Sequence, residues 1–319
     1  MADTGRDAFE TSAQSGLGDA GALTLGLRQR VTDAGLHELA AQAAHVAAAA
    51  PERMAEVYDN AAAGWLGRDV SPPAPRALDP LPISRGWWRT FWSIAAPPLG
   101  AGRQSYSQQM MELAGELDPR INARMATAAL EFPGVSPAAA GGLPQAHDIE
   151  WLSQFPPASL GYALSQELLR PGSPASDPYW TSVLPYLRHM PAPLNHINVH
   201  VIQSMPLWTL VAGYSSRALD RVALGGFLMG QVGHHYSALA SAVTLTTTAV
   251  RRPDNLEIVL DCIFKGWTHG RATRPLIEVV WEPLWALRLD QTREALQIEP
   301  FDSPYLAVQP AHGWAPRVV

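Results

Sequence analysis

The sequence of 319 residues is poor in lysine and in cysteine, with Lys265 and Cys262 as the single examples. A lone cysteine excludes a disulfide within the chain and a metal site built from several cysteines, so we expect Cys262 to be an inert core residue. The net charge of −6 gives no sign of the basic face that phosphate backbones require. We therefore expect no nucleic-acid partner.

Signals for export and for membrane spanning are also missing. The N-terminus lacks the basic and apolar regions of a secretory signal, which predicts a cytoplasmic bacterial protein. Residues 190–216 and 222–250 contain no formally charged side chain, but prolines and polar residues interrupt them, which disfavours a spanning helix. Two buried helices are expected there, and an apolar ligand tunnel between them is the more specific interpretation.

Familiar catalytic and nucleotide-binding motifs are absent as well. The chain has no Gly-x-Ser-x-Gly elbow, no phosphate loop and no Gly-x-Gly-x-x-Gly signature. We expect no cofactor.

Helix signals follow one another along most of the chain. They predict an all-α fold, a multi-helix bundle with a buried apolar core or tunnel. Residues 1–18 are polar and rich in small residues, and we expect them to form a disordered tail. Residues 19–69 are predicted to be an N-terminal helical segment, residues 70–86 a proline-rich linker, and residues 87–319 a helical domain.

An aromatic cluster of Trp87, Trp88, Phe91 and Trp92 follows the linker. Helical spacing puts Trp88 and Trp92 on one face. Packing in a core or an interface is the first interpretation, because indole rings bury large apolar surfaces. Anchoring at a membrane interface is the second.

Residues 148–298 contain a set of short phrases whose order resembles a known family. They are Asp-Ile-Glu-Trp-Leu at 148–152, Phe-Pro-Pro-Ala-Ser-Leu-Gly at 155–161, Asp-Pro-Tyr-Trp at 177–180, Leu-Trp-Thr-Leu-Val-Ala-Gly-Tyr at 207–214, Gly-Arg at 270–271 and Trp-Glu at 281–282. Together they resemble the ubiquinone (coenzyme Q) biosynthesis family known as the fourth COQ protein. The resemblance covers about half of the chain. It implies a helical fold that buries an isoprenoid or other lipid-like molecule, peripheral membrane association and a role in making quinones.

The resemblance also implies where a metal would bind. The family carries a His-Asp pair, a His three residues later and a Glu on the following helix. The matching positions here hold Met205, Pro206, Thr209 and Arg221. None of these is a usual metal ligand, and the fixed charge of Arg221 would repel a cation. We expect no metal, and Arg221 becomes a candidate for holding an anionic head group.

Histidines are the other candidates for chemistry. His196 and His200 are four residues apart on one face of a predicted helix, and His234 and His235 lie on the next helix. A displaced metal site is one interpretation, and packing or hydrogen bonding to a polar group is the other. For a catalytic protein, these four histidines and Arg221 are the candidate catalytic residues, since histidine titrates near neutrality.

One further histidine stands in a misleading context. His147-Asp148 repeats the letters of the family's metal pair, but the surrounding residues do not match. We expect Asp148 to cap a helix.

Candidate ligand contacts come from the matched helices and from the C-terminal signature. Arg271 and Arg274 are expected to pair with Glu282 or to contact a polar or anionic head group. The predicted ligand-binding residues are Met205, Trp208, Thr209, Tyr214, Phe227, Arg271 and Arg274.

These observations predict a protein that binds a hydrophobic isoprenoid, quinone-like or polyene molecule in a biosynthetic pathway, without metal chemistry. The first alternative is a repurposed metal-independent enzyme of the lyase, cyclase or isomerase type. The second is a structural subunit of a membrane-associated assembly. Expected partners are the small molecule, biosynthetic enzymes, the inner face of a membrane and a second copy in a homodimer, and the expected location is the cytoplasm or that membrane face.

Overall fold

The computed structural model describes residues 3–16, 18–71, 78–97, 105–170, 178–303 and 305. Within these ranges the chain is helical and contains no strand, which confirms the predicted all-α fold. The α-helices are α1 (Asp3–Ser15), α2 (Ala20–Gln29), α3 (Asp33–Ala48), α4 (Met54–Leu66), α5 (Arg85–Ala95), α6 (Tyr106–Gly115), α7 (Ile121–Ala129), α8 (Val135–Ala140), α9 (Ile149–Leu152), α10 (Leu160–Leu169), α11 (Pro178–Arg188), α12 (Leu194–Ala212), α13 (Ala218–Val232), α14 (His235–Arg251), α15 (Leu256–Ala272) and α16 (Leu289–Leu296). Short 3₁₀ helices are η1 (Pro51–Arg53), η2 (Pro253–Asn255), η3 (Leu276–Glu278) and η4 (Glu282–Leu284).

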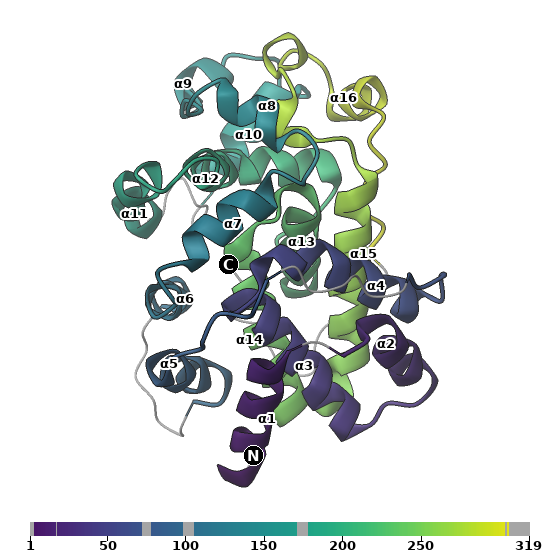
Figure 1. The fold of residues 1–319 in the computed structure, drawn as a ribbon. Coiled ribbons are helices and arrows are strands. Elements are labelled where there is room, and N and C mark those ends of the chain that lie inside the picture. Colours follow the sequence, from purple (N-terminus) through teal and green to yellow (C-terminus); the bar gives the residue numbers. More distant parts are fainter. Residues whose placement is uncertain are drawn as a thin grey trace.

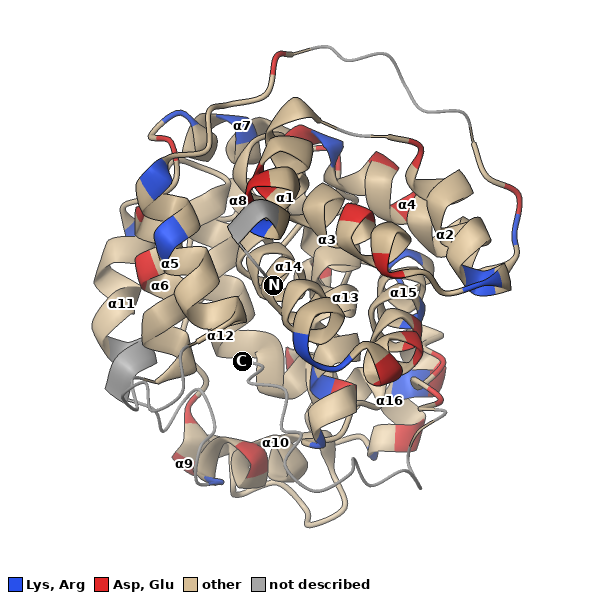
Figure 2. Cartoon of the chain, turned by 90° about the horizontal axis from the view of Figure 1, so that it is seen from below, with Lys and Arg blue, Asp and Glu red and all other residues tan. Residues whose placement is uncertain are grey.

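The helices α13, α14 and α15 occupy the middle of the molecule, where α3 and α4 pack against them (Figure 1). Helices α5, α6 and α11 lie along one side, and α9, α10 and α16 lie at one end (Figure 1). Charged residues gather on the outer helices and loops (Figure 2). Within α14 the one charged residue is Arg251, in its last turn, so this helix is free to be buried along most of its length.

Helices α13 and α15 approach each other through glycines. Gly226 and Gly230 of α13 face Gly266 and Gly270 of α15. A Cβ atom on Gly266 would overlap the carbonyl oxygen of Ala223, and one on Gly230 would lie 2.6 Å from the carbonyl oxygen of Trp267. Glycine therefore lets the two backbones touch, as it does where small residues line a helix interface.

The predicted helix cap Asp148 is confirmed by its hydrogen bond, and Ser159 caps the following helix in the same way. The Asp148 carboxylate accepts from the Trp151 backbone N–H at 3.0 Å, and the Ser159 hydroxyl accepts from the Tyr162 N–H at 3.3 Å. Both side chains satisfy an N–H group that has no partner inside its own helix. The sequence thus fixes where α9 and α10 begin.

The expectation of a disordered tail over residues 1–18 is wrong for the residues that the structure describes there. Asp3–Ser15 form α1, whose Phe9 and Ala13 are buried. The Phe9 ring contacts the rings of Trp88 and Trp92, and the Trp92 indole N–H donates to Glu10 at 2.8 Å. Long-range contacts with α5 therefore stabilise a helix with little apolar content of its own.

These contacts also confirm the packing interpretation of the aromatic cluster. Trp87, Trp88, Phe91 and Trp92 are all buried, with Trp87 stacked on Phe91 at a centroid separation of 4.8 Å. The four rings belong to the core between α1 and α5. They are consequently unavailable as exposed membrane anchors.

Part of the predicted linker is docked on the helices. The Leu81 side chain is buried and its N–H donates to the carbonyl oxygen of Ala49 at 2.9 Å. The Ile83 N–H donates to the Gln14 side chain at 2.8 Å. Residues 72–77 of the predicted linker and residues 306–319 of the predicted domain lie outside the described residues.

Among the helices that the structure describes, none combines the length and the apolar character that crossing a membrane requires.

Candidate functional site

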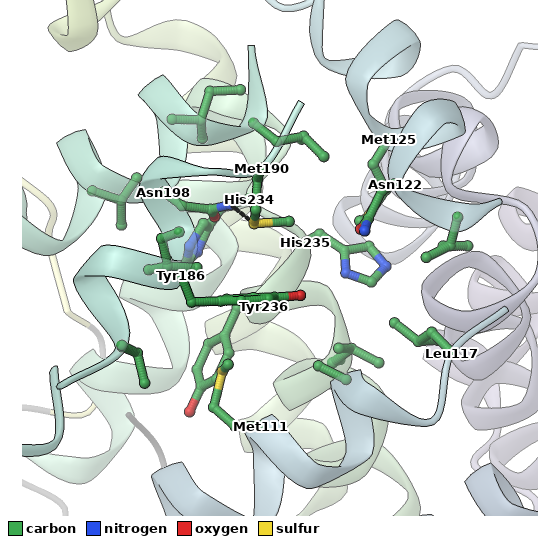
Figure 3. A pocket seen from close by; sticks show the side chains of 18 of the residues that line it. Met111, Leu117, Asn122, Met125, Tyr186, Met190, Asn198, His234, His235 and Tyr236 are labelled. Atoms are coloured by element: carbon green, nitrogen blue, oxygen red, sulfur yellow. Dashed lines mark hydrogen bonds between the residues drawn. The ribbon is translucent and has the colours of Figure 1, made fainter. Parts of the chain in front are cut away.

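A cavity of about 600 Å³ lies between α6, α7, α11 and α12, and we call it the α12 cavity. Figure 3 shows side chains from these helices and from the start of α14 arranged around one shared space. Four methionines and many aliphatic side chains make up most of the wall. Its polar side chains are Asp118, Asn122, Ser182, Tyr186, Asn198, His234, His235 and Tyr236.

A glycine turn brings two histidines to the cavity. Gly233 ends α13 with a φ of 62°, and a Cβ atom there would lie 2.6 Å from the Phe132 ring. Both features require glycine, because other residues rarely adopt a positive φ and would collide with Phe132. The turn places His234 at the N-cap of α14 and His235 in its first turn.

His235 is held in a defined orientation. Its Nε2 lies 2.7 Å from the carbonyl oxygen of Ala47. A carbonyl oxygen accepts hydrogen bonds and cannot donate, so Nε2 carries the proton and Nδ1 is left with a free lone pair in the neutral ring. Burial lowers the pKa of His235 to about 4, which keeps the ring neutral at physiological pH.

His234 is buried and neutral for the same reason. Burial, reinforced by the neighbouring His235, lowers the pKa of His234 to about 3. Its Nδ1 shares a hydrogen bond of 2.8 Å with the Ser237 hydroxyl. The two histidines thus contribute polarity to the wall of the α12 cavity without contributing charge.

Among the described residues that line the cavity, Asp118 is the only one with a formal charge, and its carboxylate is already engaged. The Arg120 guanidinium donates to both carboxylate oxygens at 2.9 Å. These hydrogen bonds lower the pKa of Asp118 to about 2. The site is therefore suited to an uncharged ligand rather than to an ionic one.

Three of the residues predicted from the sequence line this cavity, and they are Met205, His234 and His235. Met205 belongs to the side of α12 that also presents Ile197, Val201 and Ile202.

Arg221 lies apart from the cavity lining, in the first half of α13. The side chain is half-buried near Arg170. Burial, and to a lesser extent the like charge of Arg170, lowers the pKa of Arg221. The structure therefore does not bring Arg221 and His234 or His235 to one site.

His196 and His200 also lie outside the cavity lining, on a different side of α12. Their rings are 5.4 Å apart, and the Nδ1 of His196 bonds the carbonyl oxygen of Gly142 at 2.6 Å. The two pairs of histidines do not form one group. Across the described ranges, no group of three or more His, Cys, Asp or Glu side chains is arranged to hold a metal ion.

Four predicted ligand contacts are occupied by packing. Trp208 is fully buried against His200, and the Thr209 hydroxyl donates to the Met205 carbonyl oxygen at 2.7 Å. Tyr214 and Phe227 belong to an aromatic cluster near the C-terminal end of α12. The Tyr214 hydroxyl donates to His269 Nδ1 at 2.8 Å, since His269 Nε2 already bonds a carbonyl oxygen.

Arg271 joins two parts of the chain instead of lining a cavity. Its guanidinium lies 3.3 Å from the Asp59 carboxylate and over the rings of Phe132 and Trp267. Arg274 is exposed after the end of α15. Neither arginine lines the α12 cavity.

Other parts of the cavity wall were not predicted. Met111 of α6, Met125 of α7 and Tyr186 of α11 face the same space as His235 (Figure 3). Their residue types are common in ordinary cores, so the sequence alone does not identify them as cavity residues. Their shared signal is helical amphipathicity, which identifies an inward face without distinguishing a core from a cavity.

A second hollow lies between α1 and α5, beside the buried tryptophans. Arg6, Arg85 and Arg89 line it together with Asp7 and Glu10. The Arg6 guanidinium lies over the Trp92 ring at 5.2 Å. This surface has mixed charge, and the predicted membrane contact stays a prediction.

No protein-family profile matches the chain. No curated protein matches it either. Among solved structures, the chain is similar to a protein of Nostoc punctiforme that is provisionally named a ubiquinone biosynthesis protein, with a TM-score of 0.47 and 17% sequence identity. The similarity covers 66% of this chain and 96% of that one.

Proposed function

We propose that this protein binds an uncharged apolar molecule, of the isoprenoid, quinone-like or polyene kind, in the α12 cavity and holds it for enzymes of a biosynthetic pathway. The observation that carries the proposal is the lining itself: an apolar wall in which the one formal charge, Asp118, is neutralised by Arg120. A volume of about 600 Å³ falls in the range of small-molecule sites.

The size of the cavity limits what it encloses. At roughly 30 Å³ for each water-sized group, it holds on the order of 20 non-hydrogen atoms. A longer chain would therefore extend beyond the cavity. The methionines suit such a ligand, because their unbranched side chains adapt to different apolar shapes.

Met205 connects this proposal with the sequence resemblance. It stands where the resembled family has a metal-binding histidine, and it lines the cavity. A thioether there adds apolar surface, and the free lone pair of His235 supplies a hydrogen-bond acceptor for a polar end of the ligand.

Native mass spectrometry of protein purified without added lipid tests the proposal, paired with titration of the uncharged fluorescent polyene diphenylhexatriene. Ile202→Trp fills the cavity, and Leu169→Trp is the matched control at an exposed position of α10. We expect saturable binding to the wild type and to Leu169→Trp, and a loss of about tenfold or more in Ile202→Trp. Equal binding by all three proteins contradicts the proposal.

A metal-independent enzyme is the second candidate function. The observation in its favour is the neutral His235 ring, whose unprotonated Nδ1 can accept a hydrogen bond from a bound substrate and orient it for reaction. Incubation of the identified ligand with the wild type and with His235→Gln, followed by mass analysis, tests it. A product formed equally by both proteins removes His235 from the chemistry.

A further inference from the structure

A second group of histidines lies on another side of α12. His196 and His200 of this helix are joined by His147 from the loop between α8 and α9, and we call these three residues the histidine cluster. The His200 ring lies 5.4 Å from the His196 ring and 5.5 Å from the Trp208 ring, and His147 lies 5.7 Å from the Trp285 ring. None of these residues lines the α12 cavity.

Several buried nitrogens of this cluster have no hydrogen-bond partner among the described residues. His196 donates its Nδ1–H to the Gly142 carbonyl oxygen, so its Nε2 bears a lone pair in the neutral ring. That Nε2 is buried and has no hydrogen-bond partner among the residues that the structure describes. The same holds for the Nε2 of His147, for both ring nitrogens of His200 and for the indole N–H of Trp208.

The unpartnered groups are of two kinds. His196 offers an acceptor, Trp208 offers a donor, and the neutral His200 ring offers one of each. A carboxylate only accepts and an ammonium group only donates, so neither complements the whole set, and the negative charge of a phosphate would be costly to bury there. A hydroxyl group both donates and accepts, and it carries no charge that burial would penalise.

We propose that the histidine cluster is a second binding site, separate from the α12 cavity, which takes the hydroxyl group of a small neutral alcohol or phenol. The hydroxyl donates to a bare imidazole nitrogen and accepts from an imidazole or indole N–H. The loop of residues 141–148, which carries His147, is mostly exposed to solvent. The His200 residue is itself only half-buried.

Electrostatics agree with a neutral ligand. Burial, with the nearby His196 and His147 as smaller causes, lowers the pKa of His200 to about 4. Burial also lowers the pKa of His196 and of His147. All three rings are therefore uncharged at neutral pH, and they present lone pairs rather than positive charge.

The test uses the full chain labelled with ¹⁵N-histidine and a long-range ¹H–¹⁵N spectrum, which reports each ring nitrogen. Phenol is the probe, and toluene at the same concentration is the control that has the same ring without the hydroxyl. We expect phenol alone to shift the Nε2 resonances of His196 and His200. An equal response to toluene, or no response to phenol because water alone occupies the cluster, overturns the proposal.

Two variants sharpen the result. His200→Phe removes the donor and the acceptor together, and His200→Gln keeps one of each. We expect the phenol affinity to fall about fivefold to tenfold more in His200→Phe than in His200→Gln. Equal affinities in the two variants, both folded by a cooperative thermal transition, contradict the site.

The same spectrum separates this proposal from the proposed function. His234 and His235 report the α12 cavity, whereas His196 and His200 report the histidine cluster. If neither the wild type nor any variant binds diphenylhexatriene, the cavity proposal is refuted. The phenol response of the histidine cluster is then still expected, because it depends on other residues.

Discussion

His235 donates its Nε2–H to the carbonyl oxygen of Ala47 across 2.7 Å, and this bond ties the start of α14 to the last turn of α3. It links residues that are 188 positions apart. Because the bond fixes which nitrogen carries the proton, the fold of the N-terminal helices determines what His235 presents to the cavity.

Acid is expected to destabilise the protein through its buried histidines. The pKa values of His200 and His235 are lowered to about 4 and that of His234 to about 3, from 6.5 in the unfolded chain. Below pH 6.5 these histidines bind protons in the unfolded chain but stay unprotonated in the folded chain. The free energy of unfolding should be level above pH 7 and fall between pH 6.5 and 4, by about 1.4 kcal/mol per pH unit for each histidine.

Urea unfolding between pH 4.5 and 8 measures this slope. His235→Gln should reduce it by about one proton's contribution, whereas Thr11→Ala, which removes no ionisable group from an exposed position of α1, should leave it unchanged. A slope that is the same in all three proteins would show that the histidines titrate normally in the folded chain.

The glycine contact between α13 and α15 predicts opposite effects for two chemically identical substitutions. Gly266→Ala forces a methyl group against the Ala223 backbone and should cost about 1–3 kcal/mol of unfolding free energy. Gly225→Ala, in α13, places its methyl group where no atom lies within 4 Å and should gain about 0.5–1 kcal/mol. Chemical denaturation measures both, and two changes of the same sign would refute the packing argument.

Phe9→Ala should destabilise the whole protein, because α1 is packed and not a tail. Removing a buried phenylalanine costs about 3–5 kcal/mol in a typical core. Thr11→Ala, at an exposed position of the same helix, should change the unfolding free energy by less than about 0.5 kcal/mol. Thermal or urea unfolding compares the two, and equal small effects would mean that α1 is detached in solution.

Removing a bound ligand should lower the melting temperature. A ligand held at 100 times its dissociation constant adds about 2.7 kcal/mol to the unfolding free energy. Extraction with an apolar resin, followed by calorimetry, should therefore show a downward shift in the wild type and in Leu169→Trp. The shift should be absent in Ile202→Trp, whose cavity is already filled.

Much of the fold was predictable because local signals agree with it. The predicted cap Asp148 begins α9, and the uncharged residues 190–216 contain α12, most of which is buried. Helix α1 could not be found locally, because its stability depends on Phe9 and Glu10 meeting Trp92, more than 80 residues away. The α13–α15 contact does have a signal in the sequence, which is the pair of glycines four residues apart in both helices.

The cavity residues could be predicted from the sequence only where the residue type suggests a chemical role. His234 and His235 stood out as adjacent histidines in an uncharged stretch, and they line the cavity. Met111 and Met125 looked like any core residues. The neighbours of His147 in the sequence do not match a metal motif, yet folding places this residue near His200. Proximity between residues more than 50 positions apart follows from tertiary packing, which one sequence does not reveal.

Helix α12 contributes to the α12 cavity through Met205 and to the histidine cluster through His200. The same helix of 19 residues therefore connects the two proposed binding sites. A molecule that shifts this helix from one side also changes the position of the residues on the other. By thermodynamic reciprocity, whatever the first occupant does to the affinity of the second, the second does equally to the first.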